Sequence, residues 1–187
     1  MRRLLVPTLP RGELATILRW SLSGTLLAAA FGILHDQITY SISPEYFTRM
    51  KFAQFGSLQS QIPPRAFVAL IGILATWWFG LIATWILARI AGPPNLRHRI
   101  PKAWLTIALS SITLATLGFI IGPSTLTTIP DWKDSALSLG VTNLNSFAQV
   151  AGIHLGSYTG ATLATFFLSI RWTISQHRPA RSSSNHS

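Results

Sequence analysis

Four stretches of apolar residues limit what this chain can fold into. They lie at about residues 14–34, 66–88, 103–122 and 147–170. Each has the length of about 20 residues that a helix needs to cross the ~30 Å hydrocarbon core of a bilayer. Charged residues make up only 11% of the chain, whereas soluble domains carry about 25%. The sequence therefore predicts an all-α membrane protein with four transmembrane helices in an up-down bundle, forming one domain over residues 1–175.

The lysine and arginine residues indicate how these helices are oriented. With four spans, eleven of the fifteen cationic residues fall on the side of the two termini, and four of the five acids fall on the other side. By the positive-inside rule, both termini are expected in the cytoplasm. The net charge of +10 then predicts affinity for anionic lipid headgroups and argues against nucleic acid as a partner. Residues 176–187 are polar and predict a disordered cytoplasmic tail.

The first apolar stretch has an alternative interpretation as a signal peptide that is cleaved near Ala30. Basic residues precede it and small residues follow, as in a signal peptide, but the apolar run continues without a break to Leu34. We therefore expect a retained transmembrane helix.

Small residues recur at intervals of about four in the predicted spans, which lets helix backbones approach closely in lipid. The two strongest ridges lie on the first and the fourth span: Gly24, Ala28 and Gly32, and Gly152, Gly156 and Gly160. We expect these two helices to pair with each other, or one of them to pair with its copy in a homo-oligomer.

The block from His35 to Phe52, HDQITYSISPEYFTRMKF, follows the first span and holds two of the five acids. Four residues form the predicted site: His35, Asp36 and Glu45 from this block, with His154 from the fourth span. Imidazole and carboxylate groups are ligands of zinc, iron and manganese, so a divalent metal is one candidate cofactor, although the sequence does not identify the cofactor. The same groups could act as an acid–base pair or proton relay, and the two histidines could hold a haem. They could also make only structural contacts, with His35 and Asp36 at the end of the first helix.

Within the same block, Ser43, Pro44 and Glu45 predict the start of a helix that runs to about Phe55, with Ser43 as its N-cap. Its aromatic residues and its two cations are typical of a helix that lies on the membrane surface. The alternative is a helix that folds back over the mouth of the bundle. A further helical turn is expected at residues 131–138.

The block HDQITYSISPEYFTRMKF, with the stretch HLGSYTG of the fourth span, resembles one in small, uncharacterised multi-span bacterial membrane proteins. The resemblance implies location in a bacterial cytoplasmic membrane and no particular activity.

The sequence leaves three functions open. The first is a non-enzymatic membrane subunit or assembly partner that associates through its small-residue ridges and through the helix predicted after Ser43. The second is a metal-dependent or acid–base enzyme that uses the four predicted site residues. The third is a subunit of an oligomeric transporter or channel, in which hydroxyl groups would line a polar path: Thr106, Ser110, Thr113, Tyr158 and Thr165. The first function requires no metal ion or catalytic residue, and it is the leading hypothesis from the sequence.

Overall fold

The computed structural model describes residues 11–55 and 62–176, and every regular element in these ranges is helical. The four long helices are α1 (Arg11–Ile42), α3 (Pro64–Ala91), α4 (Leu96–Leu126) and α6 (Leu144–Gln176). The short elements are the π-helical turn η1 (Tyr46–Lys51), α2 (Phe52–Gln54), the 3₁₀ turn η3 (Pro93–Asn95) and α5 (Pro130–Ser138). Of the tail predicted at residues 176–187, Gln176 is the last residue of α6, and residues 177–187 lie outside the described residues.

Three of the four long helices, α1, α3 and α4, are long and apolar enough to cross a membrane. Each predicted apolar stretch lies inside one long helix, and each helix extends beyond its stretch at both ends. The difference matters most for α1, which continues to Ile42. His35 and Asp36 therefore lie within α1, and the expectation that they end the helix is wrong. The helix continues because the residues after Leu34 include no glycine or proline before Pro44.

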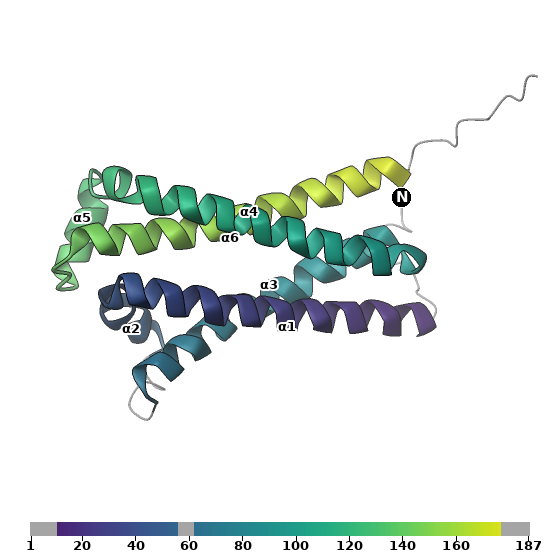
Figure 1. The fold of residues 1–187 in the computed structure, drawn as a ribbon, viewed down its shortest axis with the longest axis horizontal. Helices are drawn as coiled ribbons and strands as arrows, with labels where there is room; N and C mark the ends of the chain where they lie inside the picture. Colours follow the sequence, from purple (N-terminus) through teal and green to yellow (C-terminus); the bar gives the residue numbers. More distant parts are fainter. Residues whose placement is uncertain (1–10, 56–61, 177–187) are drawn as a thin grey trace, which may run out of the picture.

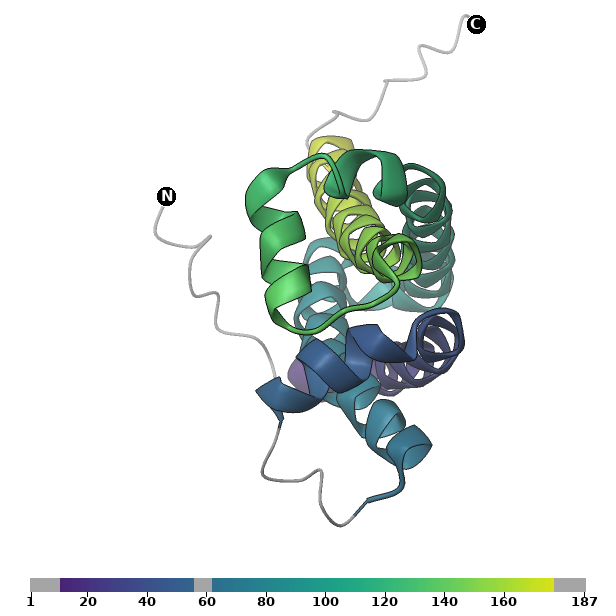
Figure 2. The ribbon, with the colours of Figure 1, turned by 90° about the vertical axis from the view of Figure 1, so that its left-hand side faces the viewer.

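The long helices form two antiparallel pairs. α1 packs along α3, and α4 packs along α6, whereas contacts between the two pairs are much sparser. Figure 1 shows that the start of α1 and the end of α6 lie at the same end of the molecule. The connecting helices α2 and α5 cover the opposite end, which faces the viewer in Figure 2.

Glycines bring the two backbones of the α1–α3 pair into contact. A Cβ atom at Gly32 would collide with the carbonyl oxygen of Gly72, and one at Gly80 would collide with that of Gly24. Close to these contacts, the Thr76 hydroxyl donates a hydrogen bond of 2.8 Å to the carbonyl of Ala28 on the neighbouring helix. Such close approach is the main source of helix association in lipid.

The α4–α6 pair is built in the same way. Gly152 lies against the backbone of Gly118, Gly156 against that of Leu114, and Gly160 against that of Ser110. The Ser110 hydroxyl donates a hydrogen bond of 3.0 Å to the carbonyl of Gly160.

The expected pairing of the first and fourth spans is therefore wrong. The small-residue ridges of both spans do make helix–helix contacts, but each ridge packs on the other helix of its own antiparallel pair. Because α3 and α4 cover both ridges, these ridges are not free surfaces for a second copy of the chain.

The segment after α1 folds back over the bundle, which is the second of the two predicted arrangements. The side chains of Tyr46, Phe47 and Phe52 are buried in a cluster with residues of α3, α5 and α6. The hydroxyl of Ser43 is buried and has no hydrogen-bond partner, so it does not act as the predicted N-cap. The expected turn at residues 131–138 is present as α5.

Replacement of Gly152 by alanine should destabilise the α4–α6 pair. The new methyl group would meet the backbone of Gly118, which cannot move aside as a flexible side chain can. Such overpacking costs about 1–3 kcal/mol. Gly12→Ala is the matched control, because a Cβ at Gly12 has no atom within 4 Å. The unfolding midpoint in detergent should fall for Gly152→Ala alone, and equal midpoints for the two variants would contradict the packing.

Candidate functional site

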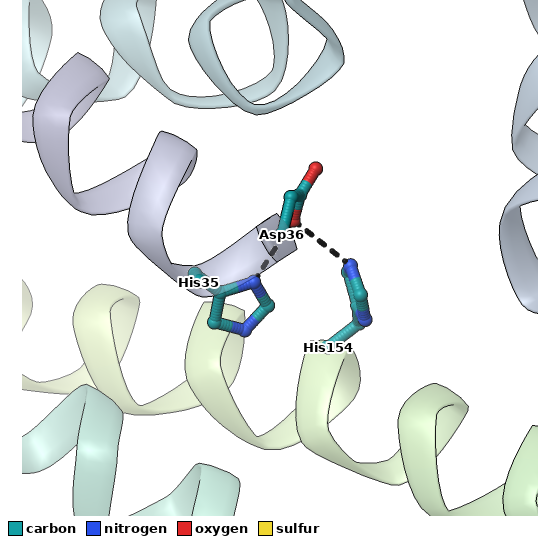
Figure 3. A group of neighbouring side chains, drawn as sticks. All are labelled: His35, Asp36 and His154. Carbon is teal, nitrogen blue, oxygen red and sulfur yellow. Dashed lines mark hydrogen bonds and ion pairs between the residues drawn. The ribbon is translucent and has the colours of Figure 1, made fainter. Parts of the chain in front are cut away.

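His35 and Asp36 from α1 meet His154 from α6 in a buried cluster between the two helix pairs (Figure 3). The Oδ1 atom of Asp36 lies 2.9 Å from Nδ1 of His35 and 3.3 Å from Nε2 of His154. The two imidazole rings are in edge-to-face contact, with centroids 4.7 Å apart. The side chains of His35, Asp36 and His154 are only 11%, 6% and 4% exposed. We call these three residues the His–Asp cluster.

The ring of His154 is oriented by its own helix. Its Nδ1 atom lies 2.9 Å from the carbonyl oxygen of Val150, one turn earlier in α6. A carbonyl oxygen can only accept, so Nδ1 carries a proton and donates it. In the neutral ring, Nε2 then presents a lone pair toward the carboxylate of Asp36. Two electron-rich atoms thus face each other in a buried site, an arrangement that a cation between them would stabilise.

His35 adds a second nitrogen to the cluster. In the tautomer with the proton on Nδ1, it donates a hydrogen bond to Asp36. The Nε2 atoms of His35 and His154 are both buried without a hydrogen-bond partner. Buried polar atoms without partners are uncommon in proteins, and a bound ion would supply the partner that these nitrogens lack.

The dimensions of the His–Asp cluster suit a metal ion. One ligand atom from each residue can be chosen so that all three lie within 4.8 Å of one another. Ligands of a tetrahedral zinc ion, with bonds of about 2.0–2.1 Å, are about 3.3 Å apart, which is the distance between Nε2 of His154 and Oδ1 of Asp36. The bond from His154 to Val150 matches the backbone contact that commonly orients a metal-binding histidine. Three protein ligands leave one position of a tetrahedral ion open, as in catalytic sites.

Aromatic residues surround the ring of His154 in the cluster. Tyr46 from η1 stacks on the ring of His154, with centroids 4.8 Å apart. Phe47 and Tyr158 contact the same ring edge-on, with centroids 6.1 Å from it. The sequence indicates that this segment is aromatic but does not assign Tyr46 to the site, because no spacing rule relates η1 to α6.

Glu45, the fourth predicted site residue, does not join the cluster. Its carboxylate accepts hydrogen bonds from the backbone N–H groups of Thr142 and Asn143, at 3.2 and 2.9 Å, and from the Thr142 hydroxyl at 2.6 Å. These residues directly precede α6, where a negative charge is favoured by the helix dipole. The hydrogen bond from the Thr142 hydroxyl, followed by that from the Asn143 backbone, lowers the pKa of Glu45 below its ordinary value. Glu45 therefore fixes η1 to the start of α6.

Two other predicted roles find no support in the described residues. Three of the five hydroxyls of the predicted polar path already donate to backbone carbonyls: those of Thr106 and Thr165 within their own helices, and that of Ser110 to Gly160 on α6. The rings of His35 and His154 are in direct contact, which leaves no space between them for a haem macrocycle.

Comparison of the chain with protein-family models, with curated proteins and with solved structures finds no match. The geometry of the cluster is therefore the basis for assigning a function.

The contacts of Glu45 should make stability depend on pH in acid. Because its pKa is lowered in the folded protein, the carboxylate stabilises the fold above its ordinary pKa of 4.5, and this contribution is lost as the pH falls through the lower folded value. The difference in free energy of unfolding between the wild type and Glu45→Gln should therefore shrink below pH 4.5. Asp134→Asn, which removes an exposed acid of α5, is the control. A difference that stays constant between about pH 3 and pH 7 would contradict the assignment.

Proposed function

We propose that this chain is a four-span membrane protein that binds one divalent transition-metal ion at His35, Asp36 and His154. The observation that carries the proposal is the ring of His154. Its Nδ1 donates to the backbone, and its partnerless Nε2 lies 3.3 Å from the carboxylate of Asp36. A metal ion between these atoms would satisfy both.

The surface of α6 supports a fourth span. This helix has 33 residues, about 50 Å of α-helix at 1.5 Å per residue, which exceeds the ~30 Å hydrocarbon core. Its outer face carries exposed Leu155, Phe166 and Phe167, which are 63%, 64% and 61% accessible. An apolar surface of this kind is typical of contact with lipid. α6 also packs along α4, which is itself long and apolar enough to cross a membrane.

The charge distribution supports an orientation with both termini in the cytoplasm. Four cationic residues lie near the connection from α3 to α4, at the end of the molecule opposite α2 and α5: Arg89, Arg97, Arg99 and Lys102. The positive-inside rule places this end in the cytoplasm, where it would contact anionic lipid headgroups. The His–Asp cluster then lies toward the outer leaflet of what we take to be a bacterial cytoplasmic membrane.

The ligand set favours zinc, iron or manganese over calcium or magnesium. Two imidazole nitrogens are present with a single carboxylate, whereas calcium and magnesium prefer oxygen ligands. With neutral histidines and an ionised Asp36, a dication would leave the site with one net positive charge. Such an ion would polarise a bound oxygen atom at its open position.

The second candidate function is acid–base chemistry, with a proton in place of the metal ion between Nε2 of His154 and the carboxylate of Asp36. If Nε2 of His154 is protonated, it forms an ion pair with Asp36, and the cluster becomes a His–Asp–His acid–base site. The assembly-partner hypothesis has less support, because it depended on the ridges and on the segment after Ser43. The ridges are covered by α3 and α4, and Tyr46, Phe47 and Phe52 of that segment are buried within the chain.

Metal titration of the purified protein tests the proposal. After chelation and dialysis in detergent, the wild type should bind one zinc or cobalt ion per chain, and cobalt should show the absorption bands of a tetrahedral site. His154→Ala and Asp36→Asn should each weaken binding by at least ~10-fold, because they remove direct ligands. The control is His98→Ala, which removes an exposed histidine of α4. Absence of binding, or equal affinities in all variants, would refute the metal site.

Single introduced cysteines test the fourth span, because the chain has none of its own. Ser138, at the end of α5 shortly before α6, and Ser175, in the last turn of α6, are both exposed. In intact cells, a membrane-impermeant thiol reagent should label Ser138→Cys and should label Ser175→Cys only after the membrane is permeabilised. Equal labelling of both variants in intact cells would show that α6 does not cross the membrane.

A further inference from the structure

An apolar cavity of about 540 Å³ lies between the two helix pairs and reaches His35 and Asp36 of the His–Asp cluster. Residues of α1, α3, α4 and α6 all line it. The cavity exists because the glycine contacts join helices within each pair, whereas the pairs meet each other through few contacts. Among its lining residues, only His35, Asp36 and Tyr158 have ionisable side chains.

The cavity has one polar end and one apolar end. Along α1 its lining extends from Asp36 to Gly24, twelve residues or about 18 Å of helix. At the far end, the indole N–H of Trp104 donates to the hydroxyl of Thr84 at 3.1 Å. Three of the hydroxyl groups between the two ends are occupied: those of Thr76, Ser111 and Ser157 donate to backbone carbonyls. The wall away from the cluster therefore offers few polar groups to a ligand.

The cavity reaches the outer surface of the bundle between the long helices. Four of its lining residues are exposed: Leu27, Trp78, Tyr158 and Thr162. In a four-span arrangement, this surface faces hydrocarbon. A ligand would therefore enter sideways from the lipid phase.

We infer that the cavity binds a long-chain fatty acid, with its carboxylate at the metal ion of the His–Asp cluster and its hydrocarbon chain extended toward Trp104. This inference rests on the proposed metal site and names the class of ligand that the site takes. The length of about 18 Å slightly exceeds the hydrocarbon depth of one leaflet, about 15 Å, so a chain of membrane-lipid length fits.

The net charge of the metal-loaded site favours a ligand with a carboxylate head group. A dication bound by Asp36 and two neutral histidines has a net charge of +1, and one carboxylate brings the buried site to neutrality. Neutrality matters because an uncompensated charge among apolar side chains is costly. Without the metal, the carboxylate of Asp36 would face that of the fatty acid and repel it. The binding of fatty acid should therefore require the metal.

Quenching of tryptophan fluorescence by dibromostearate, measured in nanodiscs, tests the inference. Bromine atoms on the chain would lie near Trp78 and Trp104, which line the cavity. We expect the metal-loaded protein to show a saturable component of quenching. Oleate should compete for it, and oleyl alcohol, which lacks the carboxylate, should not. This component should be lost after the metal is removed and in His154→Ala.

Two variants in which an alanine is replaced by phenylalanine test whether the fatty acid binds in the cavity. Ala108→Phe fills the cavity from α4, whereas Ala30→Phe adds the same side chain on the exposed side of α1, away from the cavity lining. Ala108→Phe should abolish saturable quenching and retain the metal, which reports that the protein is folded. Ala30→Phe should retain both. Equal quenching in these two variants would overturn the assignment to the cavity.

The metal content of each sample separates this inference from the proposed function. Wild-type protein that holds metal but shows no saturable quenching would refute fatty-acid binding and leave the metal site intact. Saturable quenching that survives metal removal, or that oleyl alcohol competes away, would overturn the role of the carboxylate at the metal. Wild-type protein that binds no metal would refute the proposed function, and this inference with it.

Discussion

The close approach of backbones at the glycines is the interaction on which the rest of the structure depends. Lipid gives helices no hydrophobic reason to associate, so packing must supply it. Contacts such as Gly24 with Gly80, and Gly118 with Gly152, use the small faces of all four long helices within two pairs. The two pairs meet each other through far fewer contacts. The same contacts thus produce tight pairs and an apolar cavity between them.

A buried carboxylate joins the two pairs. Asp36 belongs to α1 and the ring that it faces, His154, belongs to α6, so this contact crosses the space between the pairs. An ionisable group within the membrane is costly unless it is compensated. The segment around η1 adds to this arrangement, since Tyr46 covers His154 and Glu45 is fixed to the start of α6. The His–Asp cluster, the Tyr46 ring that covers it and the cavity therefore occupy one connected region.

Much of the helix content could be read from composition, but the helix ends could not. The apolar stretch of the first span stops at Leu34, whereas α1 continues to Ile42, because the residues that follow Leu34 include no glycine or proline that would end the helix. Of the four predicted site residues, the structure brings together His35, Asp36 and His154. Glu45 is separated from them because η1 turns its carboxylate toward the N–H groups before α6.

The sequence by itself determined that the chain forms long apolar helices, that these carry ridges of small residues, and that histidines and acids are scarce and grouped. Only the tertiary structure decided which ridges meet and which ionisable groups become neighbours. A glycine ridge is the same shallow surface whichever helix it faces, so its pattern does not name its partner. Contact between Asp36 and His154, 118 positions apart, depends on the depth and rotation of α1 relative to α6, and those are set by the packing of each helix on its own pair.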